Sequence, residues 1–573
     1  MSQPQHARRT RNVRLARQTV VAEHRAGNVY LRSPDPLPAY PRKLTERLDH
    51  WAAQAPERVF LAQRRPDGAW LRLTYAQARS RARRVAQALL ERRLSAERPV
   101  AVLSGNDFAH ALIELGALYA GVPYAPVSPA YSLLSKDFAK LKHVMRLLTP
   151  GLVFASAREP FQAAIAAALP GSTEVVYEVQ KLEVGEATGA VDDAHDKVGP
   201  DTIAKFLFTS GSTGEPKAVI NTQRMWCSNQ AMIRHMFAFF EGEPPLIVDW
   251  APWHHTAAGN HDFGLVIYNG GSYYIDEGKP LPGAIETTVR NLREIAPTWY
   301  FNVPRGYEVL LPYLRKDKQL RENFFSRLKL LWFAGAGVSQ PVFDEVKALA
   351  YETCGEEILF LTGLGSTETA PFAMGRMWET NDVTNMGLPP PGVEIKLVPA
   401  QGKLEARLKG PSITPGYWRQ PELTAQAFDE EGYYRLGDSF VLANEERPIE
   451  GLLFRGRLAE DFKLATGTWV QVGPLRARFI AHFAPWVRDV VIAGEGRNEL
   501  AALVFPAMDF PERDFLEKLK TLPSSGSSNR IARATVLKEP PSLDAGEVTD
   551  KGTINQKAVL KARAALVEEL YKR

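Results

Sequence analysis

Short apolar runs alternate with amphipathic segments along most of this chain. Residues 76–91, AQARSRARRVAQALLE, carry their apolar side chains at helical spacing, whereas residues 99–106, PVAVLSGN, form an apolar run that ends in a turn. The first pattern predicts an amphipathic helix and the second a buried strand. The later runs GLVFAS, FLFTS, TWYFNVP and LKLLWFAGAG repeat the strand-like form. Because parallel strands feed their loops from one edge of a sheet, this alternation predicts an α/β fold with functional loops at that edge.

The length of the chain predicts more than one domain. It has 573 residues, 45% of them hydrophobic, and a domain usually holds about 100 to 200 residues. Polar stretches at 183–201 and 523–529 predict exposed loops. The sequence changes character near 456–460, where EGLLFRGR passes into LAEDFKLATGTWV. We therefore expect an N-terminal tail (1–40), a large domain of layered sheets and helices (41–457) and a smaller, mobile α+β domain (458–573).

Charge and cysteine content exclude several classes of protein. The formal net charge is +5, which is too small for a nucleic-acid-binding track on so long a chain. Cys227 and Cys354 have no CxxC spacing, so neither a disulfide framework nor a cysteine zinc site is indicated. We find no secretory signal and no apolar run of about 18 residues that would span a membrane. A cytoplasmic location is therefore expected.

The first residues are strongly basic. Arginines stand at positions 8, 9, 11, 14 and 17, and no acid precedes Glu23. The pattern is compatible with an organelle presequence, but we interpret it as a solvated, disordered tail.

Residues 209–217, TSGSTGEPK, combine hydroxyl groups, glycines and a lysine. The preceding run IAKFLF predicts a strand, and Trp226, Ile233, Phe237 and Phe240 follow at helical spacing, so the loop leaves a sheet at a chain reversal. Converging amides, hydroxyl donors and a fixed positive charge suit polyphosphate oxygens. The chain has no GxxxxGK(S/T), GxGxxG or GxSxG motif, and a polar surface turn is the alternative for this stretch taken alone. The candidate phosphate-binding residues are Thr209, Ser210, Gly211, Ser212, Thr213, Gly214 and Lys217.

In its context this loop resembles a family signature. FTSGSTGEPKAV is similar to the phosphate loop of the adenylate-forming superfamily of acyl-CoA synthetases, luciferases and peptide-synthetase adenylation domains. Further similar stretches follow in the family's order: GVPYAPVSPAY, APWHHTAAG, FAGAGVSQP, TGLGSTETAP, YYRLGDSF and FRGRLAEDFK. The resemblance implies a small carboxylic acid, ATP, Mg²⁺ and coenzyme A as partners. The carboxylate would attack the α-phosphate of ATP, and a thiol would then displace AMP.

The resemblance also implies roles for individual side chains. Lys217 and the loop before it would cradle the β- and γ-phosphates, Thr367 would donate to the α-phosphate, and Glu368 would hold Mg²⁺. Asp438 and Arg457 would bind the ribose. The positions implied to lie along the adenine, the phosphates or the acid are Gly335, Ala336, Gly337, Gly363, Gly365 and Ser366.

Three histidines and an aspartate cluster at His254, His255, His261 and Asp262. A metal site is one interpretation, but the spacing matches no common zinc pattern. The resemblance instead implies that His255 forms a wall of the acyl pocket near the entry of the thiol. Trp253 suggests an aromatic lining that packs on a planar substrate, with ordinary core packing as the alternative.

The C-terminal part departs from the superfamily pattern. The resemblance implies a hinge at Ala459 and Glu460, with Ala459 where Lys or Asp is usual, and a role for Lys463 in thioester formation. Near the end, the order TDKGTINQK implies that Lys551 is the adenylation lysine, with Lys557 as the alternative.

The stretches GRLAEDFKLATGTWVQVGPLR and DAGEVTDKGTINQKAVL resemble bacterial feruloyl-CoA synthases. This resemblance implies an AMP-forming acid:CoA ligase for a hydroxycinnamic acid such as ferulate, whereas the residues alone support only an apolar, aromatic-leaning pocket. The alternatives are a ligase for another aryl or medium-chain fatty acid, one that loads a carrier-protein thiol, and a non-catalytic adenylate-binding protein. A monomer and a homodimer are both open.

Overall fold

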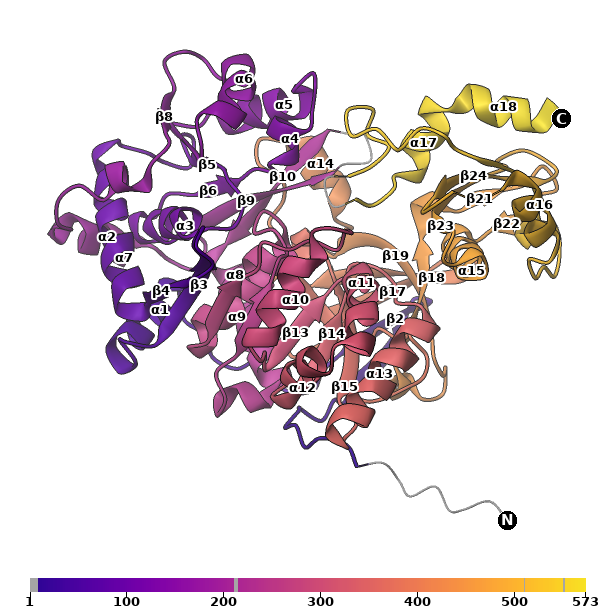
Figure 1. Cartoon of the computed structure of the whole chain (residues 1–573), viewed down its shortest axis with the longest axis horizontal. Helices are drawn as coiled ribbons and strands as arrows, with labels where there is room; N and C mark the ends of the chain where they lie inside the picture. Colours follow the sequence, from indigo (N-terminus) through magenta and orange to yellow (C-terminus); the bar gives the residue numbers. More distant parts are fainter. Residues whose placement is uncertain (1–8, 211–214, 510, 550–551, 573) are drawn as a thin grey trace.

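The structure is a computed structural model that describes residues 9–210, 215–509, 511–549 and 552–572. It has a mixed α/β architecture with a large N-terminal domain and a smaller C-terminal domain (Figure 1). The first sheet has the strand order β10-β9-β6-β5-β7-β8, and every neighbouring pair is parallel except β9 with β10. Its strands are β5 (Val100–Leu103), β6 (Tyr124–Pro126), β7 (Leu152–Ala155), β8 (Glu174–Val176), β9 (Ile203–Ser210) and β10 (Pro216–Thr222).

This sheet is buried on both faces because successive apolar side chains point in opposite directions. Alternate residues of β5 and β7 join two different cores. One core includes α2 (Tyr75–Glu91) and α3 (Phe108–Ala120), and the other includes α5 (Ala139–Leu148) and α6 (Glu159–Ala168). The parallel strands predicted from GLVFAS and FLFTS are therefore confirmed as β7 and β9.

A second parallel group carries further loops of the predicted site. The strands β13 (Trp299–Asn302), β14 (Leu330–Phe333) and β15 (Leu359–Gly365) run parallel, and β16 (Phe372–Gly375) is antiparallel to β15. This confirms the strands predicted from TWYFNVP and LKLLWFAGAG. The helices packed on this group are α10 (Ile285–Glu294), α11 (Pro304–Lys316), α12 (Lys318–Ser326) and α13 (Gln340–Cys354) (Figure 1). A mixed sheet contains β11 (Leu246–Asp249), β12 (Ser272–Ile275), β3 (Val59–Arg64) and β4 (Trp70–Thr74).

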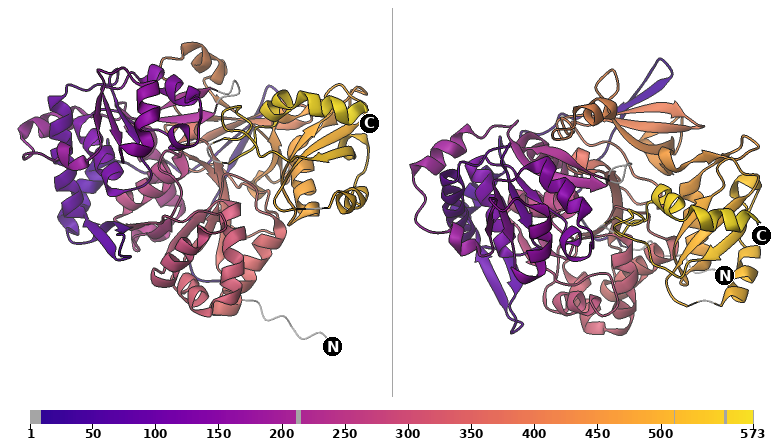
Figure 2. Two further views of the ribbon diagram at one scale, coloured as in Figure 1. Left: turned by 45° about the horizontal axis from the view of Figure 1, so that its top comes forward. Right: turned by 90° about the horizontal axis from the view of Figure 1, so that it is seen from above.

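A six-stranded antiparallel sheet joins the two ends of the large domain. Its order is β1-β2-β17-β18-β19-β20, so the N-terminal strands lie beside strands formed more than 360 residues later. The right-hand view of Figure 2 shows the indigo β1–β2 hairpin next to these orange strands. The strands are β1 (Val21–Arg25), β2 (Asn28–Arg32), β17 (Glu394–Ala400), β18 (Lys403–Lys409), β19 (Tyr434–Leu442) and β20 (Leu452–Arg457).

The segment before this sheet is also attached to the domain. Nη1 of Arg11 donates to the carbonyl oxygens of Phe325 at 2.8 Å and Leu328 at 2.6 Å, and its Nε lies 2.9 Å from Glu356. The expectation of a solvated, disordered tail is therefore wrong for residues 9–40. The basic side chains find acidic and carbonyl partners that are distant in sequence.

The small domain is built on a three-stranded sheet, β23 (Val487–Ala493), β24 (Leu500–Pro506) and β25 (Ile531–Val536). Alternate residues of these strands form one core on each face. The helices are α15 (Val472–Phe483) and α16 (Glu512–Lys520) on one face, and α17 (Gln556–Ala562) and α18 (Ala564–Lys572) on the other. In both views of Figure 2 this domain lies across the molecule from the indigo helices.

Of the helices and loops predicted from local patterns, some are confirmed and others differ in the structure. The helix predicted over 76–91 is confirmed as α2, but the helix after the TSGSTGEPK loop, α8 (Gln223–Met236), ends before Phe237 and Phe240. The polar stretch at 183–201 is not wholly an exposed loop, because it contains α7 (Gly189–Lys197), which buries Val191 and His195. In the described part of the chain, no helix is both long and apolar enough to cross a membrane.

Candidate active site

The strands on either side of the TSGSTGEPK stretch pair as an antiparallel hairpin, which confirms the predicted chain reversal. Thr209 of β9 pairs with Lys217 of β10, and Ser210 pairs with Pro216. Nζ of Lys217 lies 4.7 Å from the ring centroid of Tyr417. The predicted phosphate-binding residues Gly211, Ser212, Thr213 and Gly214 lie outside the described residues.

Glu368 contacts the same tyrosine. It lies in a single 3₁₀ turn, Thr367–Thr369, directly after β15 and Ser366. The hydroxyl of Tyr417 donates to Oε1 of Glu368 at 3.1 Å. Burial, and then the charge of Glu368, raises the pKa of Tyr417 well above its ordinary value, so this hydroxyl stays protonated at neutral pH. The structure thus brings Lys217 and Glu368 together around one aromatic ring.

Asp438 and Arg457 face each other on neighbouring strands. They are opposite in the register of β19 and β20, and Nε of Arg457 lies 3.6 Å from Oδ1 of Asp438. The side chain of Asp438 is 13% exposed and that of Arg457 is 70% exposed. Burial raises the pKa of Asp438 to about 6, although the charge of Arg457 opposes this rise. A buried acceptor beside an exposed guanidinium suits a ligand that carries hydroxyl groups.

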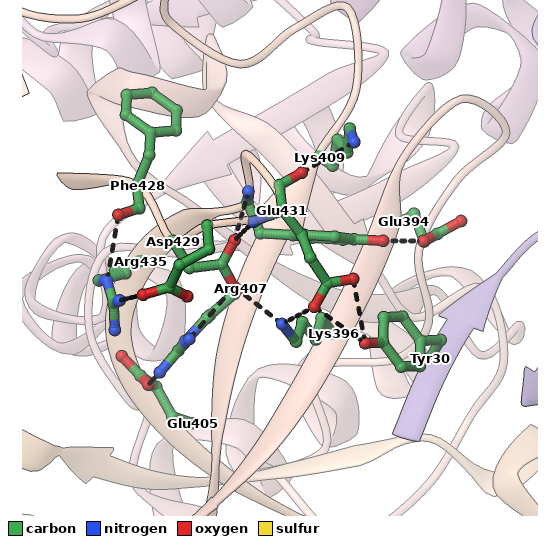
Figure 3. Close-up of polar contacts among 12 residues, drawn as sticks. Tyr30, Glu394, Lys396, Glu405, Arg407, Lys409, Phe428, Asp429, Glu431 and Arg435 are labelled. Carbon is green, nitrogen blue, oxygen red and sulfur yellow. Dashed lines mark hydrogen bonds and ion pairs between the residues drawn. The ribbon is translucent and has the colours of Figure 1, made fainter. Parts of the chain in front are cut away.

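A charged network fixes the loop that leads into β19 (Figure 3). Asp429 accepts hydrogen bonds from Lys396 at 3.0 Å and from Arg407 at 3.1 Å. Burial alone would raise the pKa of Asp429, but hydrogen bonds from backbone amides and these two cations lower it to about 2. Lys396 also binds Glu431, whose carboxylate accepts from Tyr30 of β2. The N-terminal hairpin is therefore tied to the strand that carries the predicted ribose-binding aspartate.

The glycines of the predicted nucleotide loops fall into two groups. Gly335, Ala336 and Gly337 form an exposed loop after β14, and a Cβ added at Gly337 would meet no atom within 4 Å. A Cβ at Gly363 would lie 2.4 Å from a neighbouring carbonyl oxygen, and one at Gly365 only 1.5 Å away from another. The second pair is therefore required by packing, whereas the first loop leaves room for a flat ring.

The histidine-rich segment leads into a π-helix, Ala257–Asp262. Trp253 is fully buried, and its ring packs on those of His110, Phe263 and Tyr273. The ring centroid of His255 lies 4.3 Å from that of His254. Across the described ranges, no group of three or more His, Cys, Asp or Glu side chains could hold a metal ion. Contact of Trp253 and His255 with a substrate stays a prediction.

The hinge and the two lysines of the small domain occupy different places. Ala459 and Glu460 lie in a 3₁₀ turn directly after β20. Lys463 is exposed on β21 (Phe462–Lys463), with Nζ 5.1 Å from the ring centroid of Trp469. Lys551 lies outside the described residues, and Lys557 is exposed on α17, so the choice between them stays a prediction.

Residues 543–549, which precede Lys551 in the sequence, dock on the large domain. The amide of Lys136 donates to Oδ2 of Asp544 at 3.0 Å, and Nζ of Lys140 donates to the carbonyl oxygen of Leu543 at 2.5 Å. A small pocket is lined from the large domain by Pro216, Tyr131 and Lys140 and from the small domain by Gly546, Val548, Thr549 and Asn555. Because Pro216 precedes Lys217, this segment approaches the TSGSTGEPK hairpin, as the yellow loop before α17 does in Figure 1.

Sequence reasoning missed two contacts. Tyr417 is 49 residues from Glu368, and its only local signal is an aromatic residue in the turn-forming stretch TPGYW. Lys403 forms an ion pair with Asp461 at 2.6 Å. It has no local signal, because a lysine in the strand KLEARLK is typical of an exposed position.

The donor set fits a nucleoside triphosphate with a hard cation. Lys217 supplies positive charge for phosphate oxygens, and the carboxylate of Glu368 is the kind of ligand that Mg²⁺ prefers. The open Gly335 loop leaves room for a flat base, and the carboxylate of Asp438, beside Arg457, can accept from hydroxyl groups.

Comparison with known proteins agrees with this geometry. Residues 48–418 match the AMP-binding enzyme family, and residues 461–573 match the AMP-binding enzyme C-terminal domain. The chain therefore belongs to the AMP-binding, adenylate-forming enzyme family.

Three known proteins and one solved structure are similar to this chain. The chain is 28% identical over 342 residues to a carboxylic acid reductase of Segniliparus rugosus, covering 54% of this chain but only 27% of that protein. It is 25% identical over 548 residues to human long-chain-fatty-acid–CoA ligase ACSBG1, covering 83% and 72%. It is 28% identical over 315 residues to anthranilate–CoA ligase of Pseudomonas aeruginosa, covering 52% and 54%. The fold is that of the A domain of the Segniliparus reductase in complex with AMP and a carboxylic acid, with a TM-score of 0.72, 19% identity and coverage of 93% and 94%.

Proposed function

We propose that this chain is an ATP-dependent acid:CoA ligase whose substrate is a hydroxycinnamic acid such as ferulate. The observation that carries the proposal is the arrangement of Lys217 and Glu368 around Tyr417, on the same molecule as the Asp438–Arg457 pair. In the first step the carboxylate of the acid attacks the α-phosphate of ATP and pyrophosphate leaves. In the second step the thiol of coenzyme A attacks the acyl carbon and AMP leaves.

The first step brings two anions together, so charge stabilisation and positioning dominate catalysis. Lys217 would offset charge on the β- and γ-phosphates, and Thr367 would donate to the α-phosphate. Glu368 would hold Mg²⁺, which when bound neutralises phosphate charge. Tyr417 would orient that carboxylate, and Asp438 would accept from the ribose hydroxyls.

The small domain would take part in both steps. We place the domain division between Arg457 and Leu458, with rotation about Ala459 and Glu460. Docking of residues 542–549 against the large domain supports delivery of Lys551 to the adenylation step. Rotation would then present Lys463 for thioester formation, next to His255.

Two features support an aryl acid. The rings of Trp299, Trp332 and Phe301 gather on the strands β13 and β14, and anthranilate–CoA ligase, a relative, is named for an aryl acid. The likeness to long-chain-fatty-acid–CoA ligase ACSBG1 favours a fatty acid as the second candidate.

The test is pyrophosphate release from the purified chain with ATP and Mg²⁺ across ferulate, 4-hydroxycinnamate, benzoate and octanoate, with and without coenzyme A. Release on the hydroxycinnamates, with a thioester formed only when coenzyme A is present, is the expected result. Release without any thioester would favour a carrier-protein thiol as acceptor. The absence of pyrophosphate release with every acid would contradict ligase activity.

A further inference from the structure

The π-helix Ala257–Asp262 contains a buried histidine with one unpartnered nitrogen. His261 is 2% exposed, and its Nδ1 lies 2.9 Å from Oδ1 of Asp262. Its Nε2 is buried and, among the residues that the structure describes, has no hydrogen-bond partner. Leaving a buried polar atom unpaired costs about 1 to 3 kcal/mol, so the position requires an explanation.

The backbone around His261 is held from outside the helix. Nε1 of Trp226 donates to the carbonyl oxygen of Asn260 at 2.8 Å. Nε2 of Gln230 donates to the carbonyl oxygens of Asn260 at 2.8 Å and His261 at 3.2 Å. Because the backbone and Nδ1 of His261 both form hydrogen bonds, the ring is held in one position. A hydrogen-bond partner for Nε2 must therefore lie at that position. π-helical turns of this kind are frequent at functional sites.

The ring of His261 lies against β13, where it contacts the first residue, Trp299, and Phe301, which precedes the last residue, Asn302. It stacks on Trp299, with centroids 5.8 Å apart, and meets Phe301 edge-on at 5.4 Å. Trp299 is 1% exposed and Phe301 is half-buried, and the two residues lie about 7 Å apart along one face of the strand. His261 therefore lies beside β13, and Phe301 is the contact nearer the carboxyl end of this strand, the end at which ligands of α/β sheets bind.

The charge state of this cluster limits what Nε2 can bind. Burial lowers the pKa of His261 to about 4, so its ring is neutral at pH 7. Burial also raises the pKa of Asp262 to about 8, and Asp249, Tyr273, Tyr300 and Tyr307 are further titratable groups near this cluster. A neutral imidazole nitrogen can pair with a hydroxyl group, which both donates and accepts, but gains nothing from an apolar end.

We infer that Nε2 of His261 binds a hydroxyl group on the distal end of the acyl substrate and so selects phenolic acids over their unsubstituted analogues. The inference rests on the proposed function and names the residue that sets its specificity. Trp299 and Phe301 would flank the ring that carries this hydroxyl group. His261 would act on substrate choice and take no part in the transfer of the adenylyl group.

The experiment compares kcat/KM for 4-hydroxycinnamate and cinnamate, which differ by one hydroxyl group. We expect wild type to prefer 4-hydroxycinnamate by about 100-fold or more, because a site built for a hydroxyl group rejects the analogue that lacks it. His261→Leu should bring the ratio close to one and keep activity on cinnamate. His261→Gln, which retains a hydrogen-bonding group, should keep part of the preference. His235→Leu, on the last turn of α8, is the matched control and should leave the ratio unchanged.

Other outcomes separate this inference from the proposed function. An unchanged ratio in His261→Leu would overturn the inference and point to a buried water as the partner of Nε2. Activity on octanoate alone would also overturn it while leaving the ligase chemistry intact. If His261→Leu does not fold, as judged by loss of ATP-induced thermal stabilisation, the wild-type ratio decides, and a value near one overturns the inference. Release of pyrophosphate with none of the acids would overturn the proposed function itself.

Discussion

Lys403 and Asp461 form an ion pair between the two domains, with Nζ 2.6 Å from Oδ2 and each side chain only 2% exposed. Lys403 also donates to the carbonyl oxygen of Arg455 at 2.9 Å, and Oδ1 of Asp461 accepts from the amide of Val472 at 2.9 Å. Lys403 belongs to β18 of the large domain, whereas Asp461 is the first residue that matches the C-terminal domain family. The pair therefore fixes one orientation of the small domain.

Removing one charge of this pair should release the small domain. Lys403→Met would leave Asp461 buried without its cation, a loss of about 3 to 5 kcal/mol if the domains stayed docked. Because rotation of the domain relieves this penalty, we expect faster proteolysis at residues 458–460 and slower adenylation, with little change in the unfolding of the large domain. Limited proteolysis and pyrophosphate release measure the two effects.

The matched control for this prediction is Lys409→Met, which removes an exposed lysine from the same strand. It should behave as wild type. A Lys403→Met variant that is cut at the wild-type rate would contradict a role for the pair in domain orientation.

Use of ATP should weaken on acidification. Since burial raises the pKa of Asp438 to about 6, its carboxylate becomes protonated as the pH falls through 6 and loses acceptor capacity. We expect kcat/KM for ATP to fall about tenfold per pH unit below 6, a limb that Asp438→Asn should lack.

Stability should follow the opposite course. The folded-state pKa of Asp438 lies above its ordinary value of 3.8, so the native state holds this proton more tightly, and stability falls as the pH rises from about 4 to 6. Asp438→Asn should therefore unfold at an equal or higher temperature at pH 7, while its ATP-dependent activity is low at every pH. An acid limb that persists in this variant would assign the titration to another group.

Tyr417 should act through Glu368. Tyr417→Phe removes the hydrogen bond to that carboxylate but keeps the ring beside Lys217. We expect adenylation to slow about tenfold and to require more Mg²⁺, whereas Glu368→Gln should lose about 100-fold or more. Tyr313→Phe, which removes a similar bond to Glu286 on the surface, should have no effect. An unchanged Mg²⁺ titration in Tyr417→Phe would count against the positioning role.

The two candidate lysines can be separated by half-reaction. Lys551→Ala should abolish pyrophosphate release but still transfer the acyl group from a preformed acyl adenylate to coenzyme A. Lys557→Ala is the matched control, since this exposed lysine lies on the following helix, and it should retain both reactions. Normal pyrophosphate release by Lys551→Ala would transfer the role to Lys557.

The parts of the fold that sequence predicts well depend on local patterns. The strands β5, β7 and β9 and the helix α2 follow directly from continuous or amphipathic apolar runs. The helix α7 could not be predicted from the sequence because it is mostly polar and buries only Val191 and His195. The β1–β2 hairpin is not predicted because the strand that it joins, β17, lies hundreds of residues away.

The candidate site shows the same contrast between local sequence patterns and contacts over long distances in the sequence. Lys217, Glu368 and Asp438 stand in recognisable sequence motifs, so these candidate residues could be named in advance. Their contacts could not be predicted, because Tyr417 and Glu368 meet only after two distant turns fold together. The unpartnered nitrogen of His261 likewise exists only in three dimensions, since it results from burial against β13.

The pairing of β2 with β17 also sets an order of events during synthesis. Arg32 pairs with Glu394, about 360 residues further on, so at roughly 5 to 20 residues per second a ribosome needs about 20 to 70 s to supply the partner strand. Until then the β1–β2 hairpin leaves the exit tunnel with an open edge, and the loop before Asp438 lacks its contact with Tyr30. The nascent chain can complete its first parallel sheet early, but the surface that we propose to bind the nucleotide is assembled only after β17–β20 have been synthesised.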